Sequence, residues 1–147
     1  MPNTQIDPVT FLQELVAIPS VSGEETAVAQ HLTTRMNEMG LAACIDAAGN
    51  AVGVRENLGA DDRIHHEIIL LGHMDTVPGA VPVRLEAGKL YGRGAVDAKG
   101  PLAAFVMAAV QADLPPGSRV VVIGAVEEES ATSKGARFVA TQYQPDW

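Results

Sequence analysis

The sequence has little cysteine and few basic residues, and it contains no long apolar run. Its single cysteine, Cys44, excludes an internal disulfide framework and a Cys-rich zinc finger, and it fits a reducing compartment such as the cytoplasm. The chain carries 10 Lys and Arg residues against 18 Asp and Glu residues, a net charge of −8. Because the basic residues are scattered singly, the sequence predicts neither a nucleic-acid partner nor an anionic membrane partner.

The longest helix-compatible apolar run covers residues 102–110, far short of the roughly 20 residues that a membrane span needs. Residues 1–8 are polar and lack the basic start and apolar core of a signal peptide. With 47% hydrophobic and 19% charged residues, the 147-residue chain has the composition of one globular domain. The sequence therefore predicts a folded cytoplasmic protein.

Helical and strand-like patterns alternate along the chain, which favours an α/β layered fold. Ser22 and Glu25 have the spacing of a capping box, so we expect both to cap the second helix. The continuous apolar run at 68–71 predicts a strand buried on both faces. Helices are predicted at 8–18, 23–39, 98–113 and 134–142, strands at 42–46, 51–55, 68–71 and 119–126, two short strands within 81–90, and a loop at 56–66.

Polar residues follow the apolar strand at 68–71. His73 and Asp75 are two residues apart, so in an extended segment both side chains leave the same face. The imidazole could bind a metal while the carboxylate orients the ring. The alternative is a structural pair, a histidine at the strand end bonded to an aspartate in a turn.

Asp97 follows two glycines, Gly92 and Gly94, and precedes a long helix. The glycines allow close backbone approach, so Asp97 is a second candidate for a functional carboxylate. Two other interpretations exist. Asp97 could be a plain helix cap, and the glycines could belong to a dinucleotide-binding loop, although the third glycine of that loop is misplaced.

Three consecutive carboxylates, Glu127 to Glu129, follow the apolar strand at 119–126. Such a cluster is costly unless cations or water compensate it, and a solvated acidic turn is the alternative. Together with one imidazole, these carboxylates form the O/N ligand set of a divalent ion such as zinc, and paired metals would explain the surplus of carboxylate. No Gly-x-Ser-x-Gly elbow supports a serine nucleophile. Three further histidines are predicted to be non-ligands: His31, His65 and His66.

Three segments resemble the N-terminal signatures of the co-catalytic dizinc aminoacylase and carboxypeptidase family, at 72–78 (GHMDTVP), 92–100 (GRGAVDAKG) and 127–129 (EEE). That family includes acetylornithine deacetylase, succinyl-diaminopimelate desuccinylase and enzymes of the carboxypeptidase G type. Residues 15–22 also resemble the opening of the family. Within it, residues 91–102 and 131–137 look closest to the carrier-protein-linked lysine or ornithine hydrolases, also called acetyl-lysine deacetylases.

The resemblance implies a three-layer, metallopeptidase-like α/β catalytic domain with a mixed, mostly parallel central sheet flanked by helices. Residues 1–147 would be its N-terminal portion, truncated before the dimerisation domain through which full-length relatives form homodimers. A third acidic ligand and a late histidine of the family would lie beyond Trp147, so the second metal site would be incomplete in this chain.

The resemblance also implies a role for each matching residue. His73 and Glu129 would bind one ion each and Asp97 would bridge the two, which would be Zn²⁺, or Co²⁺ in its place. Asp75 would orient the site, and Glu128 would be the general base. A shift by one position, with Glu127 as base and Glu128 as ligand, is the alternative.

The function implied is a metal-dependent amide hydrolase of amino-acid biosynthesis. It would release lysine or ornithine from a small N-acylated form or from a form linked to an amino-group carrier protein. The alternative from a different class is a non-catalytic α/β fragment with at most partial metal binding.

Overall fold

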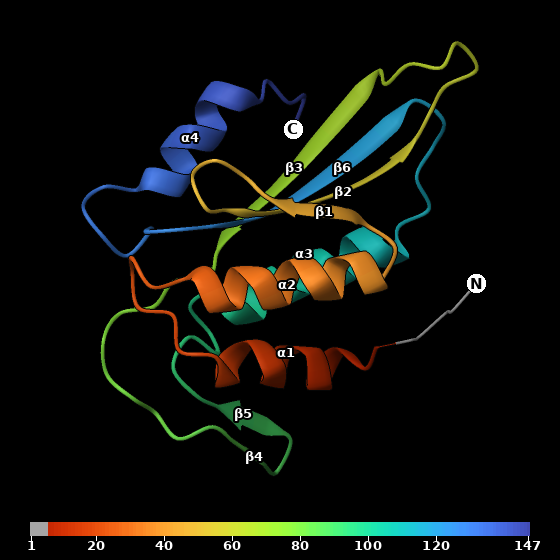
Figure 1. Ribbon diagram of the computed structural model, residues 1–147. Helices are drawn as coiled ribbons and strands as arrows, with labels where there is room; N and C mark the ends of the chain where they lie inside the picture. Colours follow the sequence, from red (N-terminus) through yellow and green to blue (C-terminus); the bar gives the residue numbers. More distant parts are fainter. Residues whose placement is uncertain (1–5) are drawn as a thin grey trace.

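The computed structural model describes residues 6–147, in which the helices and strands follow one another in the order that the sequence predicts (Figure 1). Its elements are α1 (Pro8–Ala17), α2 (Thr26–Glu38), β1 (Ala42–Ile45), β2 (Ala51–Asn57), β3 (His66–His73), β4 (Arg84–Glu86), β5 (Lys89–Tyr91), α3 (Lys99–Gln111), β6 (Ser118–Ala125) and α4 (Lys134–Gln142). No helix within residues 6–147 has the length and apolar character that a membrane crossing demands.

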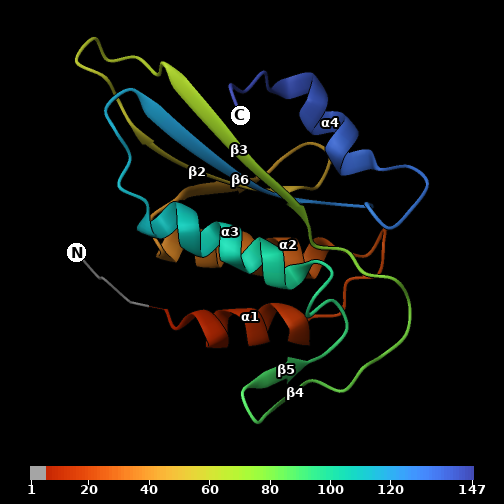
Figure 2. The same cartoon turned by 180° about the vertical axis from the view of Figure 1, so that it is seen from behind.

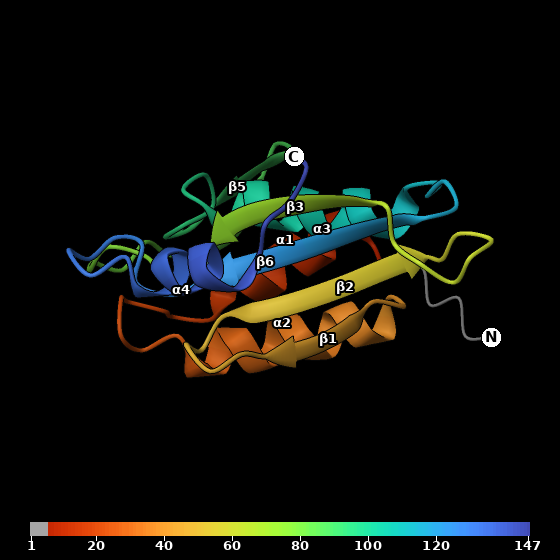
Figure 3. The ribbon, with the colours of Figure 1, turned by 90° about the horizontal axis from the view of Figure 1, so that it is seen from above.

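Four strands form the main sheet in the order β1-β2-β6-β3, which Figure 3 shows from above. The β3 and β6 strands are parallel, with His73 opposite Ala125 at their carboxyl ends. The sheet is mixed, as expected. Parallel pairing does not predominate within residues 6–147, because β1–β2 and β2–β6 are both antiparallel. The parallel pair brings the polar residues that follow β3 and β6 to one edge of the sheet.

Helices cover both faces of the sheet, which confirms the flanked, layered α/β architecture (Figures 1 and 2). The α2 and α3 helices pack on one face, α1 lies beneath them, and α4 lies on the opposite face. The main core lies between the sheet and the first three helices, where apolar side chains are removed from water. It includes Phe11, Leu15, Val28, Leu32, Met36, Met74, Leu102, Val106 and Val122.

Several local predictions are confirmed. Asp7 caps α1, since its Oδ2 accepts a hydrogen bond of 2.8 Å from the Thr10 backbone N–H. The short β4 and β5 strands meet in a turn at Ala87 and Gly88, both with positive φ, at 50° and 75°. This backbone conformation is the one that two-residue hairpin turns require.

The capping-box prediction is wrong. The α2 helix begins at Thr26, and Glu25 stands at its N-cap in a helical backbone conformation without a capping side-chain bond. The side chain of Ser22 donates instead to Asp75, and that of Glu25 accepts from Glu127. Partners that lie far away in the sequence therefore outcompete the local helix end for both side chains.

The β3 strand differs from its prediction in length and in burial. It is longer than the apolar run at 68–71, and the side chains of Ile68 and Leu71 stay 40% and 43% exposed. The reason is its place in the sheet, because β3 is one of the two edge strands of the main sheet among residues 6–147. The predicted loop at 56–66 is also shorter, since β2 extends to Asn57.

Candidate metal centre

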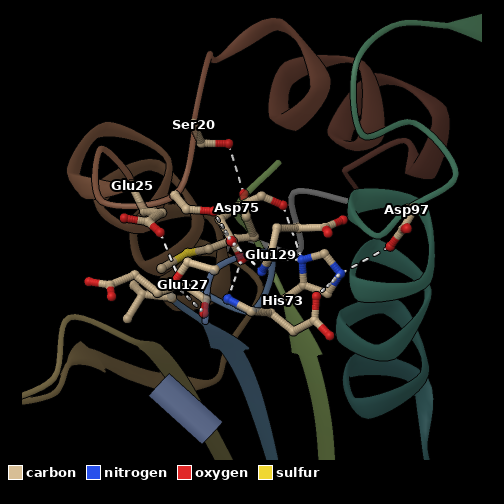
Figure 4. A network of polar contacts seen from close by, with 12 residues as sticks. Ser20, Glu25, His73, Asp75, Asp97, Glu127 and Glu129 are labelled. Atoms are coloured by element: carbon tan, nitrogen blue, oxygen red, sulfur yellow. Dashed lines mark hydrogen bonds and ion pairs between the residues drawn. The ribbon is translucent and has the colours of Figure 1, made fainter. Parts of the chain in front are cut away.

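His73 and Asp97 meet at the carboxyl end of β3. The imidazole of His73 is buried, and its Nε2 lies 3.0 Å from Oδ1 of Asp97, which is mostly exposed and precedes α3 (Figure 4). The N-cap of α3 is Ala98, without any capping side-chain bond, so the interpretation of Asp97 as a plain helix cap is wrong. The Asp97 carboxylate is directed at the histidine instead.

The segment Glu127–Glu129, termed the acid turn, follows β6 and brings two of its carboxylates to the histidine. Glu129 contributes a carboxylate oxygen to a group with His73 and Asp97 in which the ligand atoms lie within 4.8 Å of one another. The Oε2 of Glu128 lies 3.5 Å from His73 Nε2. Glu127 turns away, because its Oε2 accepts a bond of 2.6 Å from the Thr132 hydroxyl.

Asp75 connects the histidine to the acid turn. It is fully buried, and its Oδ1 lies 3.2 Å from His73 Nδ1. Its two oxygens accept the backbone N–H groups of Glu128 at 3.0 Å and Glu129 at 2.9 Å, and Oδ2 also accepts the Ser22 hydroxyl at 2.6 Å. The backbone carbonyl of Asp75 is the hydrogen-bond partner of His73 Nδ1, at 3.0 Å. Asp75 thus holds the Nδ1 edge of the imidazole ring and leaves Nε2 facing Asp97, an arrangement typical of metal-ligating histidines.

The electrostatic surroundings of His73 favour a cation. Burial lowers the pKa of His73, but the bond to Asp97 and the charges of Asp75 and Glu128 outweigh it and raise the pKa above its ordinary value. Carboxylates thus face the imidazole from three segments of the chain. Such a cluster is stabilised by positive charge placed among its members.

The donor set fits a divalent ion of borderline character. One imidazole nitrogen and carboxylate oxygens are the ligands that zinc accepts without thiolates. The 3.0 Å between His73 Nε2 and Asp97 Oδ1 is close to the roughly 3.3 Å that separates two ligands on a tetrahedral ion. Within residues 6–147 this is the one group of three such ligands that lies close enough to hold a metal ion.

Several residues that support this centre were not predicted from the sequence. Ser20 donates its hydroxyl to the Met74 carbonyl at 2.8 Å, next to His73. Lys99 is buried, and its Nζ donates to the carbonyls of Leu15 at 3.0 Å and Ile18 at 2.6 Å, which ties the start of α3 to the end of α1. Burial lowers the pKa of Lys99 to about 8. In the sequence, the only indication that Lys99 lies near the metal centre is its position two residues after Asp97.

A helix-flanked mixed sheet with a His and carboxylate cluster at the ends of adjacent parallel strands defines a metallopeptidase-like catalytic fold. The model of peptidase family M20/M25/M40 matches residues 69–147, and the chain belongs to this family. A solved structure with the same fold is the YXEP protein of Bacillus subtilis, a dinuclear metal-binding peptidase of the M20 family. Its TM-score is 0.67 at 17% sequence identity, over 91% of this chain and 38% of that one.

Two curated relatives are much more similar in sequence. The chain is 52% identical over 142 residues to the [LysW]-lysine hydrolase of Deinococcus radiodurans, which covers 93% of this chain and 37% of that protein. It is 44% identical over 139 residues to the putative [LysW]-lysine/[LysW]-ornithine hydrolase of Pyrococcus furiosus, which covers 95% of this chain and 39% of that protein. The chain thus spans somewhat more than a third of the length of these relatives.

Proposed function

We propose that this chain is the metal-binding, N-terminal portion of the catalytic domain of a cytoplasmic amide hydrolase that releases lysine or ornithine. The observation that carries the proposal is the convergence of His73, Asp97 and Glu129, with the Glu128 carboxylate beside them. Membership of the family and the names of the two curated relatives support the same class of reaction.

In this proposal His73 and Glu129 would each bind one divalent ion, Zn²⁺ or Co²⁺, and Asp97 would be shared between the two. The bound ion supplies Lewis-acid polarisation of the amide carbonyl and of the attacking water. Asp75 holds the imidazole of His73 in the orientation that directs Nε2 at the ion. His73 ends β3, Asp97 lies two residues before α3 and Glu129 follows β6, so each metal ligand lies at the end of a helix or strand.

Glu128 is the proposed general base. Its side chain is half exposed and its Oε2 lies 3.5 Å from His73 Nε2, so it borders the ligands without being enclosed by them. From there its carboxylate can take a proton from the attacking water and give it to the nitrogen of the leaving amine. Glu127 does not fill this role in our proposal, because its carboxylate is bonded to Thr132 and points away from His73.

A groove of about 350 Å³ borders the ligand cluster and could receive the amino-acid part of the substrate. Tyr91, Arg93, Asp97 and Glu129 are among the residues that line it. Its size is in the range of small-molecule sites, and Arg93 supplies a positive charge for a substrate carboxylate. The substrate class that we propose is an α-amino acid whose amine is acylated, either by a small acyl group or by a carrier protein.

The test compares Glu128→Gln with the matched control Glu127→Gln. Metal content is measured after loading with Zn²⁺ or Co²⁺, and hydrolysis is followed as release of free lysine from Nα-acyl-lysine. We expect both variants to bind metal as the wild type does. Glu128→Gln should lower the hydrolysis rate by about 10²- to 10⁴-fold, while Glu127→Gln should leave it nearly unchanged.

Two outcomes would contradict the proposal. A wild-type chain that binds no divalent ion, or that binds one and releases no lysine from Nα-acyl-lysine, would favour the non-catalytic fragment. A loss of hydrolysis in Glu127→Gln with activity retained in Glu128→Gln would instead move the general base by one position and make Glu128 the ligand.

A further inference from the structure

The backbone of the acid turn is held by two buried carboxylates from the first half of the chain. The N–H of Glu127 donates to Glu25 Oε1 at 2.9 Å, whereas the N–H groups of Glu128 and Glu129 donate to Asp75 (Figure 4). Successive N–H groups that converge on an anion form a nest. Here the anions are side chains of the protein itself, so the acid turn is fixed through its backbone while the carboxylates of Glu128 and Glu129 remain directed at His73 and Asp97.

The conformation of Glu127 needs such support. Its φ is 55°, in the left-handed region, which is unfavourable for a residue other than glycine. A change of φ at Glu127 would turn the following residues relative to β6 and carry the carboxylate of Glu129 away from His73. The position of one metal ligand thus depends on the backbone two residues before it.

The side chain of Glu25 is a buried hydrogen-bond acceptor for the Glu127 N–H. It is 5% exposed, and the Oε1 that accepts from Glu127 also accepts the Gly23 N–H at 3.0 Å. A buried carboxylate is costly unless donors compensate it, and here two backbone N–H groups do so. Asp75 cannot replace it, because both of its oxygens are already engaged by Glu128, Glu129 and Ser22.

We propose that Glu25 is a positioning residue of the metal centre, which holds Glu127 in its left-handed conformation and thereby places Glu129 beside His73 and Asp97. The inference deepens the proposed function and rests on it in one respect, that Glu129 is a metal ligand. Glu25 itself contacts neither the ion nor the substrate.

The test compares two substitutions of similar size at this position. Glu25→Gln keeps an oxygen that can accept from Glu127, whereas Glu25→Met fills the same space without an acceptor. Glu24→Met is the matched control, since Glu24 is the exposed neighbour. Co²⁺ affinity is measured by visible absorption, and exchange of the Glu127 amide proton is measured by NMR in the full chain.

We expect Glu25→Met to weaken Co²⁺ binding about tenfold, at the lower end of the effect of losing a residue that orients a ligand. The Glu127 amide should exchange faster in the same variant. Glu25→Gln should stay within about threefold of the wild type in affinity, and Glu24→Met should match the wild type. Equal Co²⁺ affinity in Glu25→Met and Glu24→Met would overturn the proposal.

The exchange measurement on the wild type keeps the test decisive if Glu25→Met fails to fold. The Glu127 amide should then be protected to the same degree as those of Glu128 and Glu129, and an unprotected Glu127 amide would refute the role of Glu25. A wild-type chain that binds no Co²⁺ but has a protected Glu127 amide would contradict the proposed function and leave the support of the turn by Glu25 standing.

Discussion

Asn50→Asp replaces the side-chain NH2 group by a carboxylate oxygen and leaves the volume of the side chain almost unchanged. Asn50 is fully buried, and its Oδ1 accepts the Val126 N–H at 3.0 Å, immediately before the acid turn. Its Nδ2 donates to Asp46 Oδ2 at 2.9 Å and to the Gly135 carbonyl at 3.3 Å. An aspartate could keep the first bond, but it has no hydrogen for the other two and would place a second carboxylate against Asp46.

The magnitude follows from these contacts. An uncompensated buried charge typically costs about 3–5 kcal/mol, and the Gly135 carbonyl would also lose its partner. We therefore expect the free energy of unfolding at pH 7 to fall by about 3–5 kcal/mol, which lowers the melting temperature by roughly 10 °C in a domain of this size. Proximity to Asp46 raises the folded-state pKa of the new carboxyl group, so the penalty should shrink as the pH falls towards about 4.

Asn37→Asp is the matched control. Asn37 also makes two donor bonds, to the carbonyls of Thr33 and Ala43, and one acceptor bond from the Ala43 N–H, but it is exposed. Water can replace those bonds, so Asn37→Asp should lower the free energy of unfolding by only about 1 kcal/mol. Urea unfolding at pH 7 and pH 4 measures both variants. Equal losses in the two variants at pH 7 would refute the reasoning from burial.

Two further predictions concern helix contacts. The Glu14 carboxylate accepts a hydrogen bond from the Arg35 side chain, and this bond holds the pKa of Glu14 below its ordinary value. The pair therefore stabilises the folded protein above the ordinary pKa of a glutamate. This stabilisation is lost as the pH falls through the pKa of Glu14 in the folded state. Glu14→Gln should lower the free energy of unfolding by about 1 kcal/mol at pH 7 and by almost nothing in acid. A deficit of the same size at both pH values would count against this assignment. In Gly135→Ala, the new Cβ would lie 2.6 Å from the backbone N of Val126, so thermal unfolding should show a loss of about 1–3 kcal/mol, and an unchanged melting temperature would contradict the clash.

The sequence was most informative where chemistry and local pattern coincide. Apolar runs predicted the strands, and the polar residues at their ends placed His73 and Glu129 at one edge of the sheet, because parallel strands end together. Asp97 was predicted from its position just before a long helix, and the start of that helix lies at the same edge. The roles of metal ligand, orienting residue and base assigned to these positions stay predictions. The choice of Glu128 over Glu127 as base came from the resemblance, and the structure adds only the direction of each side chain.

Residues that act through distant partners could not be predicted from the sequence. Ser22 and Glu25 satisfy a local capping pattern, and nothing nearby in the sequence reveals that they bond to Asp75 and Glu127 instead. The buried Lys99 was missed for the same reason, since a lysine is expected in water unless its acceptors are known. The partners of these three side chains depend on which distant segments the fold brings together.

The hydrogen bonds that hold the acid turn join residues far apart in the sequence, and this affects how the chain folds. Glu25 and Glu127 are separated by 102 residues, and the Asp75 bonds to the turn span 53 and 54 residues. Contacts between distant residues form only after large loops have closed, which slows folding. We therefore expect the ligand cluster to be among the last regions to form. A divalent ion should then bind a chain that is already folded rather than guide its collapse, so refolding rates should be insensitive to metal.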